Sequence, residues 1–487
     1  MEALSIKEAV MATGGTLLCG DENTQITSVV TSSTEVTKDA LFVPLIGERV
    51  DAHQFIAQSI QKGACAVFVM KPKEEIYYDP AVCYIQVENT LKALQDLAFY
   101  YRNRFPLPVI GITGSVGKTT TKEMIAAALE TKYEVLKTAG NMNSQVGLAL
   151  TMFGIERKHQ VAVIEMGMSE EGEIAKLAKI ARPRLAVITN IGVSHIEQLG
   201  SRENIRKEKL NIINEFSHDK DCYLYVNEAD NLLNVLPAYQ SELQQPEHNC
   251  IIDLNYKTKE ALKDCHLLIY GINGNGNFKA TDVTIHGDGM KFIYHYPEGA
   301  CEVSLQVLGE HNVMNAVVAL SIAYQLGIEV DIAKRGLEEY LPIAMRGQVY
   351  KKDGVTIIDD TYNASPDSMK SGLNVLCTVS DSTRRIAVLG DVLELGKVSH
   401  DCHYEVGMYI DQLSKNGMHV DEVLTVGKGS RAIVEAIVAS NSNILLHCFK
   451  DNWQIIRYLK QTLSKGDAVL VKGSRGMHMD EIVKELI

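Results

Sequence analysis

Several features of membrane, secreted and nucleic-acid-binding proteins are missing from this sequence of 487 residues. No apolar run approaches the roughly 20 residues that a membrane-spanning helix needs, so we expect no membrane insertion. Positive charge is not in excess, because 48 Lys and Arg stand against 61 Asp and Glu. The net charge of −13 argues against a nucleic-acid partner, which would need a basic surface.

Signals of export and of metal-binding or disulfide frameworks are also absent. The N-terminus, MEALSIKEAV, lacks the basic-then-apolar pattern of a signal peptide. The ten cysteines form no C-x-x-C pair and show no zinc-like spacing, which fits free thiols in a reducing compartment. What is present, 46% hydrophobic and 22% charged residues, is ordinary for a globular protein. We therefore expect a cytoplasmic protein of two to four domains.

Alternating strand and helix patterns predict an α/β fold with three domains in series. Residues 1–89 mix short strands with one helix, and residues 90–342 combine a glycine-rich loop with several strand–helix alternations. Residues 343–487 again alternate apolar strands with helices, which is typical of a doubly wound, Rossmann-like sheet. The fold class is thus α/β, with a central parallel sheet of the P-loop type.

The stretch GSVGKTT at 114–120 indicates a phosphate-binding loop between a predicted strand and a predicted helix. Glycines let backbone N–H groups approach a phosphate, and the helix start adds partial positive charge. The strict P-loop pattern has glycine where this chain has Ile112, so the loop is a variant, and a chance glycine-rich turn is the alternative. We favour ATP, held by Gly114, Ser115, Gly117, Lys118, Thr119 and Thr120, with the Thr119 hydroxyl on Mg²⁺.

Two further strands of the central segment end in polar residues, Glu165 and His195. Because the carboxyl ends of parallel strands share one edge, we expect both side chains to lie near the phosphates held by Lys118. With Thr119 they would form a divalent-metal site, for which Mg²⁺ is the natural ion. The alternatives are an ordinary acid at a strand end and a loop histidine.

Lys209 shares the apolar face of a predicted helix, four residues from both Ile205 and Ile213. A buried lysine tends to lose its proton, and a neutral amine is a nucleophile. The alternative is a lysine whose stem lies along the apolar face while its ammonium reaches water.

Polar residues farther along the chain are candidates for the rest of a nucleotide. Asn315 lies near a predicted helix start, where it is either a cap or a partner for an adenine edge. Arg346 opens the third domain, and Asp360 follows one of its strands. We expect Arg346 to reach phosphate across a domain cleft and Asp360 to hold ribose.

Together these motifs resemble the Mur ligases of bacterial cell-wall synthesis. The resemblance runs from Phe42 to the end of the chain, in the family's order, through GITGSVGKTTTKEM, GNMNSQVGLALT, IEMGMSEEGEI, ITNIGVSHIEQLGS, GEHNVMNA, IDDTYNASPDSM, LGDVLELG and VLVKGSRGM. Within the family, TYNASPDSM and LGDVLELG favour members that add D-alanyl-D-alanine to UDP-N-acetylmuramoyl-tripeptide. The resemblance implies those two partners, the three-domain Mur ligase architecture, and ATP with Mg²⁺. The oligomeric state stays open, with a monomer as the default expectation.

The resemblance also implies individual roles. Lys118, Glu165, His195 and Lys209 would form the catalytic centre, with Lys209 carbamylated as an extra metal ligand. Asn143 would lie near the muramoyl-peptide, and Tyr362, Asn363 and Asp391 near the incoming dipeptide. The chain departs from the family at the uridine site, where the usual Asp-Ser-Arg is replaced by Thr31-Ser32-Ser33, so that Ser32 alone is retained there.

The reaction that fits these expectations is ATP-driven amide formation through an acyl phosphate. A sibling ligase that adds a different amino acid or dipeptide, a P-loop kinase or ATPase, and a nucleotide-binding regulator without catalysis are the alternatives. A kinase or ATPase would need Lys118 and Thr119 but neither a buried Lys209 nor a third domain with strand-end acids.

Overall fold

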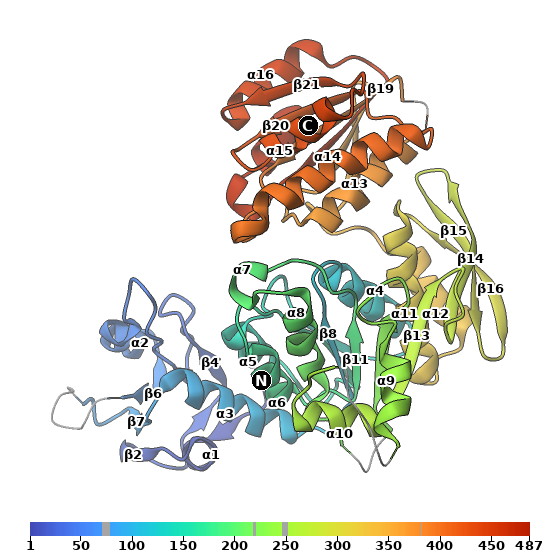
Figure 1. Ribbon diagram of the computed structural model, residues 1–487. Helices are drawn as coiled ribbons and strands as arrows, with labels where there is room; N and C mark the ends of the chain where they lie inside the picture. Colours follow the sequence, from blue (N-terminus) through green and yellow to red (C-terminus); the bar gives the residue numbers. More distant parts are fainter. Residues whose placement is uncertain (71–77, 218–220, 246–251, 381) are drawn as a thin grey trace.

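The computed structural model of the protein describes residues 1–70, 78–217, 221–245, 252–380 and 382–487. Its sheets fall into three consecutive stretches of chain (Figure 1). We refer to them as the N-terminal unit (strands β1–β7), the central unit (β8–β16) and the third unit (β17–β22). None of the helices in the described ranges combines the length and apolar character that crossing a membrane requires.

The N-terminal unit is a five-stranded sheet in the order β2-β7-β6-β5-β4, with a small antiparallel pair β1–β3 beside it. The predicted strands around residues 40 and 65 are β5 and β6, and the predicted helix near residues 53–62 is a 3-10 turn followed by α2. Its elements are β1 (Leu4–Ser5), α1 (Ile6–Thr13), β2 (Thr16–Cys19), β3 (Gln25–Ile26), β4 (Ser28–Val30), β5 (Ala40–Phe42), η1 (Ala52–Phe55), α2 (Ile56–Gln61), β6 (Ala64–Val69) and β7 (Cys83–Gln86).

The central unit is a nine-stranded sheet in the order β16-β15-β14-β13-β12-β11-β8-β10-β9. Strands β8–β14 run parallel to their neighbours, and β15 and β16 extend the sheet as antiparallel hairpins. The strands are β8 (Val109–Thr113), β9 (Val135–Lys137), β10 (Val161–Glu165), β11 (Leu185–Ile188), β12 (Tyr223–Asn227), β13 (His266–Ile272), β14 (Phe278–His286), β15 (Gly289–Tyr296) and β16 (Gly299–Leu305).

The helices that precede or follow those strands cover both faces of the sheet. They are α3 (Thr90–Asn103), α4 (Lys118–Glu130), α5 (Gln145–Phe153), α6 (Glu173–Ala181), α7 (Ile196–Leu199), α8 (Arg202–Leu210) with η3 (Asn211–Ile213), α9 (Leu236–Leu243), α10 (Tyr256–Asp264), α11 (Glu310–Gln325) and α12 (Val330–Glu338). Because side chains alternate across a strand, Ile110 and Ile112 of β8 join the apolar cluster under α4 and α11, while Val109 joins the cluster under α5 and α6.

The third unit is a six-stranded sheet in the order β17-β18-β22-β19-β20-β21, parallel except for β17. Two apolar clusters fill its two faces, which confirms the predicted doubly wound sheet. Its elements are β17 (Gln348–Lys352), β18 (Val355–Asp359), α13 (Pro366–Thr378), β19 (Arg384–Gly390), η4 (Gly396–Val398), α14 (Ser399–Lys415), β20 (Glu422–Val426), α15 (Arg431–Ala439), β21 (Leu445–Phe449), α16 (Asn452–Thr462), β22 (Asp467–Lys472), η5 (Arg475–Met477) and α17 (Asp480–Leu486).

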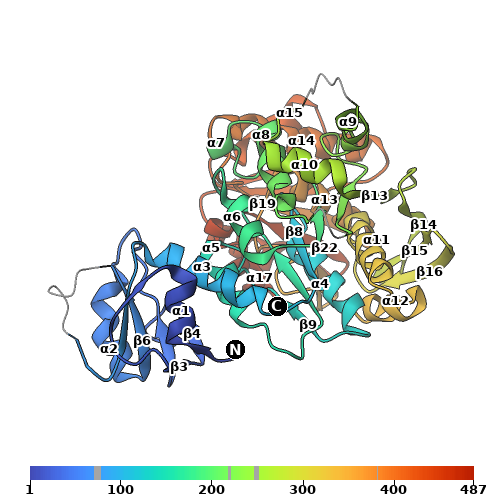
Figure 2. The same ribbon diagram turned by 90° about the horizontal axis from the view of Figure 1, so that it is seen from below.

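The hydrophobic core does not break where the first sheet ends. One cluster continues from Leu4 of the N-terminal unit through Tyr101 of α3 to Ile174 of α6. The view from below shows the N-terminal unit projecting from one side of the central unit, with α3 leading from one into the other (Figure 2). The predicted boundaries, 1–89, 90–342 and 343–487, separate the strands in this way but remain a proposal for the domains.

Candidate active site

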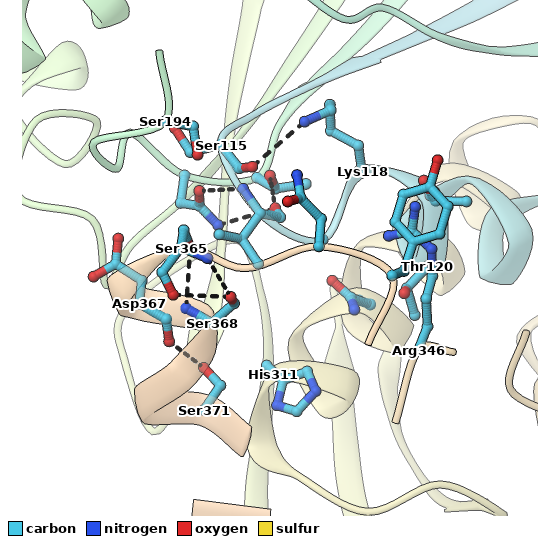
Figure 3. A pocket seen from close by; sticks show the side chains of 18 of the residues that line it. Ser115, Lys118, Thr120, Ser194, His311, Arg346, Ser365, Asp367, Ser368 and Ser371 are labelled. Carbon is cyan, nitrogen blue, oxygen red and sulfur yellow. Dashed lines mark hydrogen bonds between the residues drawn. The ribbon is translucent and has the colours of Figure 1, made fainter. Parts of the chain in front are cut away.

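A cavity of about 490 Å³ lies between the central and third units. The loop before α4, the ends of β10 and β11 and the start of α11 form one side, and the segment from Arg346 to the first turns of α13 forms the other. Figure 3 shows Ser115 and Lys118 of the loop on one side, and Ser365, Asp367 and Ser368 on the other. The cavity thus brings the phosphate loop to a segment that begins more than 200 residues later in the chain, at Arg346.

The glycine-rich loop follows β8 and leads into α4, as the sequence predicts. Gly114 has a φ of 151°, and a Cβ there would lie 1.8 Å from Thr189 Oγ1, so only glycine fits. Helix α4 begins at Lys118, behind a left-handed Gly117 cap without a side chain to bind the first N–H groups. Those groups are therefore available to an anion.

Lys118 turns back onto its own loop, where its Nζ donates to the Gly114 carbonyl oxygen at 2.7 Å. Enclosure by the protein lowers the pKa of Lys118; Glu165 opposes this shift and Arg346 adds to it. The lysine thus shares with a carboxylate and an arginine a cavity wide enough for a phosphate chain.

Glu165 and His195 lie beside the loop, which confirms the predicted gathering at one sheet edge. Strand β8 is hydrogen-bonded to β10 on one side and β11 on the other, with Glu165 paired to Ile112 and Ile188 paired to Thr113. Glu165 Oε1 accepts a hydrogen bond of 2.6 Å from Asn143 Nδ2. Both residues, with Asn143, line the cavity.

His195 meets the third unit directly, since its Nδ1 lies 2.8 Å from Glu394 Oε2. Burial lowers the pKa of His195, with Lys118 and Lys209 adding to the effect, while the Glu394 carboxylate opposes it. The imidazole therefore lies near two lysines and is paired with one carboxylate.

Lys209 is buried, with 2% of its surface exposed, which confirms the burial predicted from helical spacing. Burial, reinforced by Lys118, lowers the pKa of Lys209 well below its usual value. Glu208 does not neutralise it by pairing, because the Glu208 carboxylate accepts from the backbone N–H groups of Gly172 and Ile174 at the start of α6. A neutral amine in this position is chemically available.

The donor atoms fit Mg²⁺. Glu165 Oε2 is buried without a hydrogen-bond partner among the described residues, and the buried Thr119 lies in the first turn of α4. A hard cation satisfies such an orphaned carboxylate oxygen. Within the described ranges, no three His, Cys, Asp or Glu side chains gather closely enough to hold a metal ion by themselves. A cation here would also need oxygen ligands from phosphate and water.

The opposite wall carries the predicted nucleotide residues of the third unit. The Arg346 guanidinium stacks 3.9 Å above the Tyr362 ring. Asp360 Oδ2 pairs with the buried Lys472 at 2.6 Å, and Lys472 Nζ also donates to the Asn363 carbonyl oxygen at 3.0 Å. All five residues line the cavity.

Asn315 is on the central-unit side of the same cavity, together with Thr120. Its Oδ1 accepts from the Thr121 hydroxyl at 2.9 Å, and Nδ2 is 3.4 Å from Asn312 Oδ1. The side chain is thus oriented by residues of α4 and α11.

Four predicted residues do not line the cavity. Gly114 directly precedes Ser115 of the phosphate loop, and Lys209 is buried near Lys118 and His195.

Ser32 and Asp391 lie farther away. Ser32 lies in the loop after β4, where its hydroxyl is 2.7 Å from Thr34 Oγ1. Asp391 follows β19, and its carboxylate accepts from the backbone N–H groups of Lys428 and Ser430 at 2.9 and 2.7 Å. Neither belongs to the cavity lining.

Sequence reasoning missed many of the polar residues that line the cavity, among them Ser194, His311, Asp367 and Lys472. Each stands in a quoted motif, and three of them stand near a residue that was singled out, as His311 precedes Asn315 and Asp367 follows Asn363. Their motifs were the available signal, but nothing in the letters shows that the third unit turns these side chains toward the loop.

With this geometry in place, comparison with known proteins defines the class. Three family models match: "Mur ligase family, catalytic domain" over residues 25–102, "Mur ligase middle domain" over 112–323, and "Mur ligase, glutamate ligase domain" over 345–475. The chain belongs to the Mur ligase family.

Individual relatives show which members of the family the chain is similar to. The chain is 37% identical to UDP-N-acetylmuramoyl-tripeptide–D-alanyl-D-alanine ligase of Bacillus subtilis (strain 168), over 96% of this chain and 94% of that one. The enzyme of the same name from Escherichia coli (strain K12) is 32% identical over 94% and 93%. Among solved structures, MurF from Acinetobacter baumannii aligns with a TM-score of 0.86 at 29% identity, covering 100% of this chain and 99% of that one. MurF ligase from Thermotoga maritima in complex with ADP aligns with a TM-score of 0.78 at 28% identity, covering 94% and 96%.

Proposed function

We propose that this chain is an ATP-dependent ligase that joins D-alanyl-D-alanine to UDP-N-acetylmuramoyl-tripeptide during peptidoglycan precursor synthesis. The observation that carries the proposal is the single cavity in which the phosphate loop, Glu165 and His195 face Arg346 and Asp360. The names of the relatives and the ADP complex of the Thermotoga maritima enzyme support it. Through the cell wall the activity contributes to cell shape and division.

The site in the cell and the assembly state are part of the same proposal. We propose a cytoplasmic monomer. Nine cysteines of the described residues are free thiols, which fits a reducing compartment.

The reaction divides into two transfers. A carboxylate oxygen of the tripeptide attacks the γ-phosphorus of ATP, the bond to the bridging oxygen breaks, and ADP leaves behind an acyl phosphate. The amine of D-alanyl-D-alanine then attacks the acyl carbon, loses a proton, and expels phosphate as the amide forms. Both steps crowd anionic oxygens together, so positioning and positive charge account for most of the catalysis.

The chain's own residues supply that positioning. The N–H groups at the start of α4 and the Lys118 ammonium face the phosphates, and Arg346 approaches from the third unit. Thr119, Glu165 and His195 would hold Mg²⁺, which when bound adds positive charge to the phosphate oxygens. Asn315 would meet adenine and Asp360 the ribose, while Asn143 would orient the muramoyl-peptide and Tyr362 and Asn363 the dipeptide.

Lys209 would act through a carbamate. Burial lowers the pKa of Lys209 and favours the neutral amine, which would add to CO₂, forming an N–C bond and releasing a proton; the product would be an anion near Lys118 and His195. The orphaned Glu165 oxygen and the small number of acidic ligands among the described residues support an additional anionic ligand.

Phosphate release tests the function. The purified chain is assayed with Mg-ATP and UDP-N-acetylmuramoyl-tripeptide, with D-alanyl-D-alanine, with D-alanine as the matched control amine, or without an amine. We expect phosphate to be released at a high rate only in the assay that contains D-alanyl-D-alanine. Equal release without any amine would identify an ATPase instead, and preference for another amine would identify a sibling ligase.

A further inference from the structure

Two residues with rare backbone conformations meet across the cavity rim. His195 has a φ of 61° and Glu394 a φ of 63°, and their side chains are 2.8 Å apart. Residues other than glycine seldom adopt the left-handed backbone conformation, because it is strained for them. Where they do adopt it, they are often found at functional sites. The central unit and the third unit each contribute one of them.

Glu394 is carried by a loop that is fastened at three points. Asp391 accepts from the N–H groups that open the loop before α15, as described above. The Val392 N–H donates to His403 Nε2 at 2.9 Å, and the Leu393 N–H donates to Ser474 Oγ at 2.9 Å. Asp391 therefore has a clear task outside the cavity: it fixes the loop that presents Glu394.

The same loop is seated on α7, the short helix that His195 opens. A side chain at Gly396 would come within 2.9 Å of Glu197 Cγ, and Ile196 packs against the apolar core of the third unit. Figure 1 shows α7 at the end of the central unit that faces the third unit. The pairing of His195 with Glu394 thus belongs to a packed contact between the two units.

The chemistry of the pair assigns the imidazole tautomer. A carboxylate only accepts hydrogen bonds, so in a neutral His195 ring the contact favours the tautomer with the proton on Nδ1, which leaves Nε2 a free lone pair. No hydrogen bond to another described residue involves His195 Nε2, and His195 lines the cavity. A histidine that binds metal through one nitrogen is commonly oriented by a carboxylate on the other.

We propose that Glu394 is a positioning residue of this ligase: it orients His195 from the third unit, so that divalent-cation binding at the central unit depends on how the third unit is seated. The inference rests on the proposed function, because it assigns a divalent cation to the cavity. It gives the LGDVLELG motif two tasks, with Asp391 holding the loop and Glu394 reaching the histidine.

Binding of Mn²⁺, followed by the electron paramagnetic resonance signal of the free ion, tests the proposal without turnover. The full chain is titrated with Mn²⁺ in the presence of a non-hydrolysable ATP analogue, as unaltered protein and as Glu394→Ala and Glu394→Gln. We expect about tenfold weaker binding for the alanine variant and a smaller loss for glutamine, whose carbonyl oxygen still accepts from Nδ1. Glu394 is 58% exposed, so both variants are expected to fold.

Glu435→Ala is the matched control, because Glu435 pairs with the exposed His400 at 3.0 Å within the third unit and away from the cavity. It should bind Mn²⁺ like the unaltered chain. In a His195→Ala background, Glu394→Ala should change the affinity less than twofold, since the residue it orients is gone.

The outcomes separate the inference from the function. Equal Mn²⁺ affinity of the Glu394→Ala variant and the unaltered chain, an equal loss in the His195→Ala background, or no Mn²⁺ binding at all would overturn the role of Glu394. Intact Mn²⁺ behaviour without dipeptide-dependent phosphate release would overturn the ligase assignment alone.

Discussion

The two junctions of the central unit are filled differently. Toward the N-terminal unit, one apolar cluster continues through α3 without interruption. Toward the third unit lies a cavity lined largely by polar side chains, and among the described residues two ion pairs cross this junction, His195–Glu394 and Lys351–Asp288. The first junction resembles the inside of a domain and the second resembles an interface between domains.

The difference indicates where motion occurs. Packed apolar interiors deform little, so the N-terminal and central units are expected to move as one body. A junction built around a polar cavity can open and close more readily than an apolar core, and in the proposed function the third unit delivers Arg346 and Asp360 to the nucleotide. The substrate-joining chemistry is therefore expected to depend on the second junction and the stability of the fold on the first.

Lys118→Ala is expected to have the largest effect. Loss of the only ammonium in the phosphate loop removes charge compensation in both transfers, so dipeptide-dependent phosphate release should fall at least about 10³-fold. Thermal unfolding should stay within about 2 °C of the unaltered chain, since Lys118 bonds only carbonyls of its own loop. Lys132→Ala, just beyond the end of α4, is the control and should keep its activity. Retained turnover in Lys118→Ala would remove the loop from the chemistry.

Tyr101→Ala tests the apolar junction. The ring is fully buried against Phe105 and Phe153, and its hydroxyl donates to the Ile155 carbonyl oxygen at 2.6 Å. Truncation should lower the free energy of unfolding by about 3–5 kcal/mol, measured by urea titration with circular dichroism. Activity and the KM for ATP of the folded fraction should not change.

A separate, early unfolding transition of the N-terminal unit in Tyr101→Ala would contradict the view that the N-terminal and central units form one body. Tyr101→Phe is the milder companion: it keeps the ring and removes the hydroxyl, which also accepts from the Glu2 N–H at 2.8 Å. It should lose about 1–2 kcal/mol.

Much of the polar junction's central side could be predicted from the sequence. Apolar strands that end in Glu165 and before His195 predict one sheet edge, because successive parallel strands place their carboxyl ends together. The burial of Lys209 could be predicted because helical spacing alone decides which face a residue shares with Ile205. These predictions needed only local periodicity and one rule of sheet geometry.

The remainder depends on contacts between distant segments. Asp391 and Glu394 stand in one motif, yet Asp391 is bonded within its own unit and Glu394 reaches the central unit. Hydrogen bonds of Asp391, Val392 and Leu393 to residues 403, 428, 430 and 474 hold the loop in this position. In the same way α3 has the pattern of a connecting helix, and only its packing shows that it carries the core across residue 89. Sequence periodicity predicts on which face of a helix or strand a residue lies, but it does not predict how one unit packs against another.

Lys209→Ala tests the proposed carbamate near the metal-binding residues. Without the amine no carbamate forms, and we expect phosphate release to fall about 10²-fold. Bicarbonate together with a short-chain acid such as acetate should restore part of the rate by supplying the missing anion. Lys207→Ala is matched to it on the same helix, because Lys207 is partly exposed and pairs with Asp253 at 2.7 Å. A fully active Lys209→Ala enzyme would exclude the carbamate.

Lys351→Ala is expected to have the smallest effect, although it breaks an ion pair between the same two units as Glu394→Ala does. Lys351 and Asp288 are 60% and 71% exposed, and pairs of this kind contribute about 0.2–1 kcal/mol. Neither residue lines the cavity described above, so phosphate release should change less than twofold and Mn²⁺ affinity not at all. If Lys351→Ala instead lowered the Mn²⁺ affinity as much as Glu394→Ala does, surface ion pairs in general, and not Glu394 in particular, would position the third unit. A much larger loss of Mn²⁺ affinity in Glu394→Ala than in Lys351→Ala would mean that the third unit acts on cation binding through His195 in particular.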